Sequence, residues 1–110
     1  DALRDQLESS FTKYDFLILP VATTTAIKHN PEHTPISIDG TNVDYWDNFL
    51  YPAAFNATGH PALTVPLGLN AEGLPIGVQI VGPMNSEKRL IKFAKLIEPL
   101  HTGFVKPETK

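Results

Sequence analysis

The sequence predicts an α/β fold in which part of a mixed β-sheet is flanked by helices. Two apolar, β-branched runs at residues 62–66 and 76–81 are separated by turn residues, as is typical of two buried strands. Apolar residues also recur at helical spacing near both ends of the chain. From Tyr51 to Ser86 the only formally charged side chain is Glu72, which lies in the turn. Because uncharged strands are typical of sheets covered on both faces, we expect these strands to belong to an interior.

The N-terminal segment predicts a helix followed by a strand. Apolar residues recur every four positions from Leu3 to Phe11, which predicts a helix over residues 2–13. The apolar run at residues 16–19 predicts a short buried strand that ends at Pro20, which has no N–H to donate. A helix followed directly by an apolar strand favours an α/β layer arrangement.

The segment 21–44 has no sustained period and is rich in Pro, Gly, Asn, Asp and Thr, which predicts a long loop. Within it, Ile36–Ile38 predicts a short strand, with Asp39-Gly40 as a tight turn. A loop of this length in a compact domain is usually functional or covered by another segment.

The segment 44–55 is rich in aromatic and apolar residues. Trp46, Phe49 and Leu50 have i, i+3, i+4 spacing, which predicts a short helix. Pro52 is expected near the end of this helix or at a kink in it.

The last part of the chain predicts a strand pair and a closing helix. Residues 56–61 are expected to form a turn, and residues 68–74 reverse the chain, with Asn70 and Gly73 able to adopt positive φ. The short reversal predicts that the two flanking strands are antiparallel neighbours.

The closing helix is expected to have Asn85 or Ser86 as its cap and to stop at Pro99. A mobile tail is expected at 101–110. The apolar stripe of this helix comprises Leu90, Phe93, Ala94 and Ile97.

The composition limits the classes of function. With 110 residues the chain forms one domain at most. A net charge of −3 gives no electrostatic reason to expect nucleic acid. Cysteine is absent, which excludes a disulfide framework and a zinc–cysteine site.

No apolar run approaches the roughly 18 residues of a membrane span, and no signal-peptide pattern is present, so we expect a cytoplasmic protein. Since the chain starts inside a predicted helix, residue 1 is not expected to be its natural start.

Four separated blocks resemble one known family in the right order. Residues 56–68 read Asn-Ala-Thr-Gly-His-Pro-Ala-Leu-Thr-Val-Pro-Leu-Gly, and residues 73–82 read Gly-Leu-Pro-Ile-Gly-Val-Gln-Ile-Val-Gly. Residues 14–20 and the helix starting near Ser86, with Glu87 in its first turn, complete the set. Together these blocks resemble the C-terminal part of the amidase signature enzymes.

The resemblance covers about residues 15–99, so we assign residues 1–100 to the C-terminal part of an amidase signature domain. It implies hydrolysis of amide bonds by a serine nucleophile, assisted by a second serine next to a cis peptide bond and by a lysine base. In the family these residues lie in a Gly-Gly-Ser-Ser-Gly-Gly type segment and upstream of it. No serine of this chain sits in a glycine-rich turn, so no catalytic residue is expected here. The serines are Ser9, Ser10, Ser37 and Ser86.

The aromatic segment is the candidate substrate-binding region. We predict that Trp46, Phe49, Tyr51 and Asn56 form part of a cleft wall, because pockets are mostly apolar and the resemblance places this segment beside the acyl-binding cleft. The alternative is that the aromatic side chains are ordinary core. In the family's glutamine-specific amidotransferases, an acidic residue precedes the Asn-x-x-Gly block by a few positions. Here these positions read Asn48-Phe49-Leu50, and Asp47 comes slightly too early, which favours a general amidase.

Three further patterns have alternative interpretations. His29-Asn30-Pro31-Glu32-His33 matches the His-x-x-Glu-His pattern of some zinc peptidases, but its proline keeps the two histidines off one helical face, so we favour a polar loop. His60 has no carboxylate beside it in the sequence and is interpreted as a packing or hydrogen-bonding residue. Asn56-Ala57-Thr58 is a glycosylation sequon in a segment expected to be buried, and we treat it as coincidence.

The leading hypothesis is therefore a piece of an amidase whose reactive groups lie outside this chain. The alternative is a non-catalytic interaction module built on the same scaffold. We expect no cofactor and no metal. The expected partners are the remainder of the amidase domain or a second copy of the chain, with a small amide substrate in the parent enzyme, and neither nucleic acid nor membrane.

Overall fold

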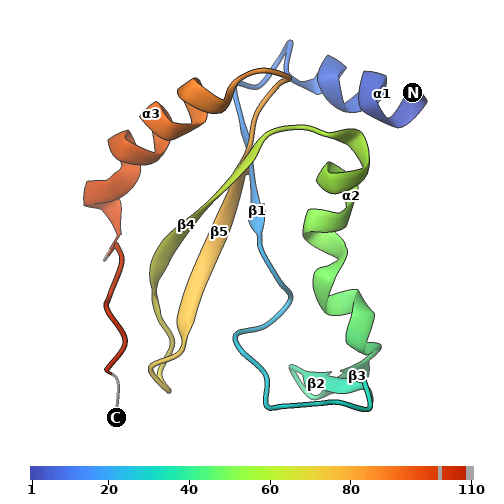
Figure 1. The fold of residues 1–110 in the computed structure, drawn as a ribbon, viewed down its shortest axis with the longest axis vertical. Helices are drawn as coiled ribbons and strands as arrows, with labels where there is room; N and C mark the ends of the chain where they lie inside the picture. The colour runs from blue at the N-terminus through green and yellow to red at the C-terminus, as the bar shows by residue number, and fades with distance from the viewer. Residues whose placement is uncertain (102, 109–110) are drawn as a thin grey trace.

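The structure is a computed structural model that describes residues 1–101 and 103–108 (Figure 1). Within these ranges the fold is α/β, as the sequence predicts. The elements in chain order are α1 (Ala2–Ser10), β1 (Leu17–Pro20), β2 (Ile36–Ile38), β3 (Thr41–Val43), the 3₁₀ helix η1 (Tyr45–Phe49), α2 (Leu50–Thr58), β4 (Ala62–Leu69), β5 (Pro75–Val81), α3 (Glu87–Ile97) and the 3₁₀ helix η2 (Glu98–Leu100).

The main sheet has the strand order β1-β5-β4, and both of its pairings are antiparallel. The predicted antiparallel pair is confirmed as the β4–β5 hairpin, in which each strand is longer than expected. In the connecting turn, the Asn70 side chain accepts hydrogen bonds from the backbone N–H groups of Glu72 and Leu74 (2.9 Å each). Gly73 has a φ of 79°, as predicted, whereas Asn70 acts through its side chain and does not adopt positive φ.

The hydrophobic core lies between α3 and one face of the main sheet. Val65 from β4, Ile80 from β5 and Leu90 from α3 are buried at its centre. The predicted stripe on the closing helix is confirmed, because its members pack here. The surrounding, partly buried residues are Phe16, Leu63, Val78, Phe93, Ala94 and Ile97. In Figure 1, α3 lies on one side of the three strands and α2 on the other.

Coverage of the sheet by this chain is partial. The end of β5 at residues 79–81 is buried, but its beginning is exposed at Ile76. Leu67 and Leu69 of β4 and Ile18 of β1 are exposed as well. Within this chain the expectation that the strands are covered on both faces is therefore met only by the last residues of β5.

The helix boundaries differ from the prediction for local reasons. Helix α1 ends at Ser10 instead of residue 13, and turns follow it. Helix α2 continues to Thr58, so Asn56 lies in a helix and the predicted turn at residues 56–61 is wrong at its start. Pro52 is tolerated because it lies in the first turn, where backbone N–H groups have no acceptor within the helix.

Two predicted turns have the backbone geometry that their residues suggest. Gly59 ends α2 with a φ of 75°, and its N–H donates to the carbonyl oxygen of Phe55 (2.8 Å). Asp39 and Gly40 have φ values of 50° and 79° and join β2 to β3, which confirms the predicted strand and tight turn. The predicted mobile tail falls partly outside the described residues, and its mobility stays a prediction.

Candidate functional site

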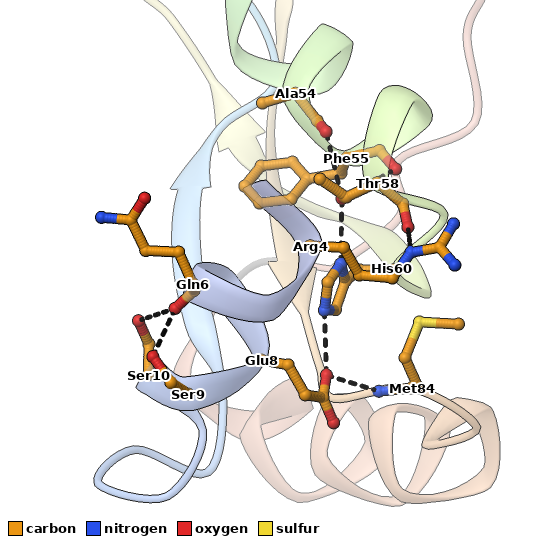
Figure 2. Close-up of polar contacts among 10 residues, drawn as sticks. All are labelled: Arg4, Gln6, Glu8, Ser9, Ser10, Ala54, Phe55, Thr58, His60 and Met84. Carbon is orange, nitrogen blue, oxygen red and sulfur yellow. Dashed lines mark hydrogen bonds and ion pairs between the residues drawn. The ribbon is translucent and has the colours of Figure 1, made fainter. Parts of the chain in front are cut away.

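A buried polar cluster surrounds His60, just after the C-terminus of α2 (Figure 2). His60 Nε2 lies 2.9 Å from Glu8 Oε2 on α1, and its Nδ1 lies 2.9 Å from the Thr58 hydroxyl at the end of α2. The Phe11 ring packs against the imidazole with a centroid distance of 5.7 Å. A carboxylate therefore does orient this histidine, although it lies 52 positions away in the sequence.

The same cluster joins three segments of the chain. The backbone N–H of Met84, in the loop between β5 and α3, donates to Glu8 Oε2 (3.2 Å). The Arg4 side chain donates from Nε to the carbonyl oxygen of Thr58 (2.7 Å), which would otherwise be an unpaired helix terminus. The N-terminal helix is thus fixed both to the end of α2 and to the start of the closing helix.

The order carboxylate–imidazole–hydroxyl is that of a catalytic triad, but the contacts exclude this role. A triad histidine must take a proton from an accessible hydroxyl. Thr58 is completely buried, and its hydroxyl donates to the carbonyl oxygen of Ala54 (3.1 Å) inside α2. An ionised carboxylate only accepts, so Nε2 of His60 donates to Glu8, and the remaining nitrogen, Nδ1, faces the buried Thr58 hydroxyl and not a substrate. The interpretation of His60 as a hydrogen-bonding residue agrees with this geometry.

Three of the four serines have no base as hydrogen-bond partner within the described residues. The hydroxyls of Ser9 and Ser10 both donate to the carbonyl oxygen of Gln6 within their own helix (2.6 and 3.4 Å). Ser86 is buried, and its hydroxyl has no hydrogen-bond partner among the described residues. An activated serine needs a base within hydrogen-bond reach, and these contacts provide none.

The predicted cleft residues lie on the surface of the described chain. Trp46 is 61% exposed, Phe49 42% and Tyr51 38%. The structure brings Trp46 and Phe49 together with Tyr45 in one aromatic cluster, with ring centroids 5.1–6.3 Å apart. Tyr51 and Asn56 lie further along, on α2, and are exposed.

The two histidines of the zinc-type pattern do not form a metal site. The His33 ring packs against Tyr45 (4.6 Å between centroids) and Trp46 (5.0 Å) and extends the aromatic cluster. Within residues 1–101 and 103–108, no group of three or more metal-ligating side chains is present. The zinc-peptidase hypothesis is therefore not supported, and the segment is a loop with His33 at a positive φ of 52°.

Sequence reasoning missed the role of Asn48 as an anchor. Its side chain is buried in η1, and its Oδ1 accepts from both the backbone N–H (3.0 Å) and the hydroxyl (2.6 Å) of Thr23. This pair fixes the loop after β1 against the aromatic segment. The sequence offered little signal, because Asn48 follows Asp47 and is one of two adjacent polar residues in an aromatic turn.

Beside this anchor the structure has a groove of about 470 Å³. The loop at residues 20–26, Thr64 of β4 and residues 75–77 of β5 line it. It lies next to η1, because Thr23 lines it and contacts η1 through Asn48. A second pocket of about 330 Å³ is lined by residues 27–31 and by Tyr45 of the aromatic cluster.

Comparison with known proteins gives a consistent result. Residues 1–91 match the family model described as Amidase. The A subunit of the glutamyl-tRNA(Gln) amidotransferase of Neisseria meningitidis is 34% identical over 94 residues, which cover 86% of this chain and 18% of the relative. The crystal structure of the corresponding protein from Thermotoga maritima is similar with a TM-score of 0.77 and 28% identity, over 97% of this chain and 23% of that one. A bacterial aryl acylamidase of the amidase signature family has a TM-score of 0.74 and 25% identity, over 88% of this chain and 20% of that one. The chain spans about a fifth of the length of these relatives.

Proposed function

This chain belongs to the amidase family, and we propose that it forms the C-terminal part of a larger hydrolase that cleaves the carbon–nitrogen bond of a small amide substrate. The observation that carries the proposal is the match of residues 1–91 to the family model, joined to the structural similarity over nearly the whole chain. The relatives include an aryl acylamidase and part of an amidotransferase, so the shared chemistry is that of the amide group.

In this proposal the nucleophile and its base come from residues outside these 110. Two observations support it. The hydroxyls of Ser9 and Ser10 are bonded within their helix, and both ring nitrogens of His60 are engaged by Thr58 and Glu8. A serine nucleophile must donate its hydroxyl proton to a base, and these hydroxyls donate to a backbone carbonyl oxygen instead.

Exposed apolar side chains support a missing remainder of the domain. Large apolar residues are exposed on every layer of the described chain, including Ile18 at one edge of the sheet, Ile76 in the hairpin and Leu96 on α3. Each such side chain is worth roughly 1.5–3 kcal/mol when fully buried, so leaving many of them in water forfeits much of the available stability. We propose that the rest of an amidase domain covers them.

We propose a general amidase and not a glutamine-specific enzyme. The position where the glutamine-specific amidotransferases have an acidic residue falls at Asn48-Phe49-Leu50, and the Asn48 side chain is buried and bonded to Thr23. An uncharged, engaged amide cannot pair with a substrate ammonium group as a carboxylate would. The cleft wall of Trp46, Phe49, Tyr51 and Asn56, and the cytoplasmic location, stay predictions.

A fragment complementation experiment tests the proposal. The 110-residue chain and the remainder of the full-length protein would be expressed separately and together, and the release of nitroaniline from p-nitroacetanilide would be measured. We expect no turnover by the chain alone and recovery of turnover when both parts are combined. Turnover by the isolated chain would show that the reactive groups lie within it.

The same experiment decides between this proposal and a non-catalytic interaction module. If the full-length protein hydrolyses no amide, while the isolated chain is a stable monomer or a defined dimer in sedimentation, the interaction module is the better description. A control is the full-length protein with Thr41→Val, an exposed substitution on β3 that does not line the groove.

A further inference from the structure

His33 belongs to the zinc-type sequence pattern, and the proposed function leaves it without a role. Its backbone has a φ of 52°, in the left-handed region that residues other than glycine seldom adopt. Residues in such conformations persist only where the surrounding structure fixes them, and they are enriched at ligand-binding and catalytic sites. The contacts of His33 show what fixes it and what its side chain does.

A closed turn at residues 30–34 holds His33 in this conformation. The backbone N–H of His33 donates to the carbonyl oxygen of Asn30 (3.1 Å). Asn30 Oδ1 accepts from the backbone N–H (3.1 Å) and from the hydroxyl (3.0 Å) of Thr34, and Asn30 Nδ2 donates to the carbonyl oxygen of Thr34 (2.8 Å). Asn30 therefore closes the turn with both ends of its side-chain amide, and the turn fixes the backbone that carries the imidazole.

The turn directs the imidazole of His33 onto the aromatic cluster. Its ring centroid lies 4.6 Å from that of Tyr45 and 5.0 Å from that of Trp46. Tyr45 and Trp46 also meet edge to face, with an angle of 89° between the ring planes. Ring pairs at these distances stabilise one relative orientation. The imidazole thus connects the loop after β1 to the two aromatic residues at the start of η1.

Trp46 is the member of the cluster whose side chain most needs such a contact. Its backbone is fixed, because its N–H donates to Asp44 Oδ1 (2.8 Å) at the start of η1. Its side chain is 61% exposed, and an exposed side chain can exchange between rotamers. His33 restricts the indole from outside η1, and the closed turn keeps His33 itself in place.

We propose that His33 is a positioning residue, which holds the indole of Trp46 in the orientation that the cleft wall requires. The inference rests on the proposed function, since it takes Trp46 to contact the amide substrate. Ordering a side chain on binding costs free energy, and a side chain that is already ordered avoids this cost. Loss of the His33 ring is therefore expected to weaken substrate binding about two- to tenfold without changing the chemical step.

The test uses the full-length protein with His33→Asn, because asparagine tolerates a positive φ but has no aromatic ring. We expect the KM for p-nitroacetanilide to rise about two- to tenfold and kcat to stay unchanged. Asn30→Ala opens the turn without altering an aromatic residue and is expected to give the same change. His29→Asn makes the same chemical change at an exposed position of the same loop, and this matched control is expected to leave the KM unchanged.

A signal from the indole itself separates positioning from a general effect on folding. In protein labelled with 5-fluorotryptophan, the fluorine NMR resonance of Trp46 is identified by its absence from Trp46→Ala. We expect this resonance to shift and broaden in His33→Asn and in Asn30→Ala, and to stay unchanged in His29→Asn. In the Trp46→Ala background, His33→Asn is expected to have no further effect on the KM, because His33 acts through the indole.

The outcomes separate this inference from the proposed function. If the wild type hydrolyses amides but His33→Asn changes neither the KM nor the resonance, or if His29→Asn has the same effect, the inference is wrong while the proposed function stands. A shifted resonance with an unchanged KM would show that the orientation of Trp46 does not matter for binding, which also overturns the inference. If the wild type hydrolyses no amide, the proposed function fails, and the inference fails with it whatever the resonance shows.

Discussion

Replacing Ser86 by alanine is expected to stabilise the protein, against the usual effect of such a change at a helix N-cap. An N-cap Ser→Ala substitution ordinarily costs about 0.5–2 kcal/mol, because the hydroxyl accepts a bond from a backbone N–H. At the N-terminus of α3 the Ser86 side chain makes no capping hydrogen bond. Its hydroxyl is instead buried and has no partner among the described residues, a state that costs about 1–3 kcal/mol. Removing it should therefore raise the free energy of unfolding by up to about 1 kcal/mol after the small loss of packing.

Gly82 provides the partner mutation for a double-mutant cycle. A Cβ built on Gly82 would overlap the Ser86 hydroxyl and lie 3.3 Å from Ser86 Cβ and 3.4 Å from Leu90 Cδ2. Because Gly82 does not have positive φ, alanine is allowed by the backbone, and its cost reports packing alone. We expect Gly82→Ala to cost about 1–3 kcal/mol by overpacking, and Ser86→Ala to recover most of this loss.

Thermal unfolding of the full-length protein, followed by circular dichroism, gives the ranking of the four members of the cycle. The expected order of midpoints is Ser86→Ala highest, then wild type, then the double mutant, then Gly82→Ala. A lower midpoint for Ser86→Ala than for the wild type would show that the hydroxyl does cap the helix or binds a group from another segment of the protein. Strictly additive effects would refute the proposed overlap.

Three further results are expected. His60→Ala should lower the free energy of unfolding by about 2–4 kcal/mol, through the loss of a buried ring and its hydrogen bonds, yet leave kcat unchanged in protein that folds. Glu8→Gln should cost less than about 1 kcal/mol, because the Glu8 side chain is 43% exposed. An unaltered unfolding midpoint with abolished turnover in His60→Ala would instead make His60 catalytic. Gly59→Ala should lower the free energy of unfolding by about 1–2 kcal/mol, since alanine is strained at a φ of 75°, and Gly59→Asn should lower it less. Equal losses for the two variants in chemical denaturation would contradict this. Trp46→Ala should change the unfolding midpoint little, because the ring is 61% exposed, but should raise the KM for p-nitroacetanilide several-fold; an unchanged KM would remove Trp46 from the cleft wall.

Local patterns predicted the elements of this fold well because their determinants are close in sequence. The stripe from Leu90 to Ile97 needs only helical spacing, and the β4–β5 hairpin needs only a short turn between uncharged runs. The N-terminal limit of the predicted turn at residues 56–61 was wrong, because α2 extends until Gly59 provides an αL terminus. A helix signal and a turn signal overlap in this segment, and nothing local decides which residue ends the helix.

The polar contacts could not be predicted in the same way. Glu8 and His60 are 52 positions apart, and Thr23 and Asn48 are 25 positions apart. Both contacts join segments whose neighbourhood depends on the tertiary fold, and the strand order β1-β5-β4 is likewise not encoded in any short window. His60 was therefore correctly interpreted as a hydrogen-bonding residue without its partner being identifiable.

The His60 cluster and the groove beside the Thr23–Asn48 pair differ in whether they leave space for a ligand. This difference distinguishes a cluster that stabilises the fold from a surface that can bind a small molecule. Around His60 every polar group has a partner. The ring is buried, both of its nitrogens are hydrogen-bonded, and Arg4 donates to the Thr58 carbonyl oxygen at the end of α2. At the groove, the Thr23–Asn48 pair is also satisfied, but the lining residues beside it form an uncharged concave surface. A saturated buried cluster can stabilise the fold but offers no free polar group to a ligand, whereas an open, largely apolar concavity is the kind of surface that binds small molecules. We therefore predict that any residues of this chain that contribute to substrate selection lie at the groove and the aromatic cluster, and not at His60.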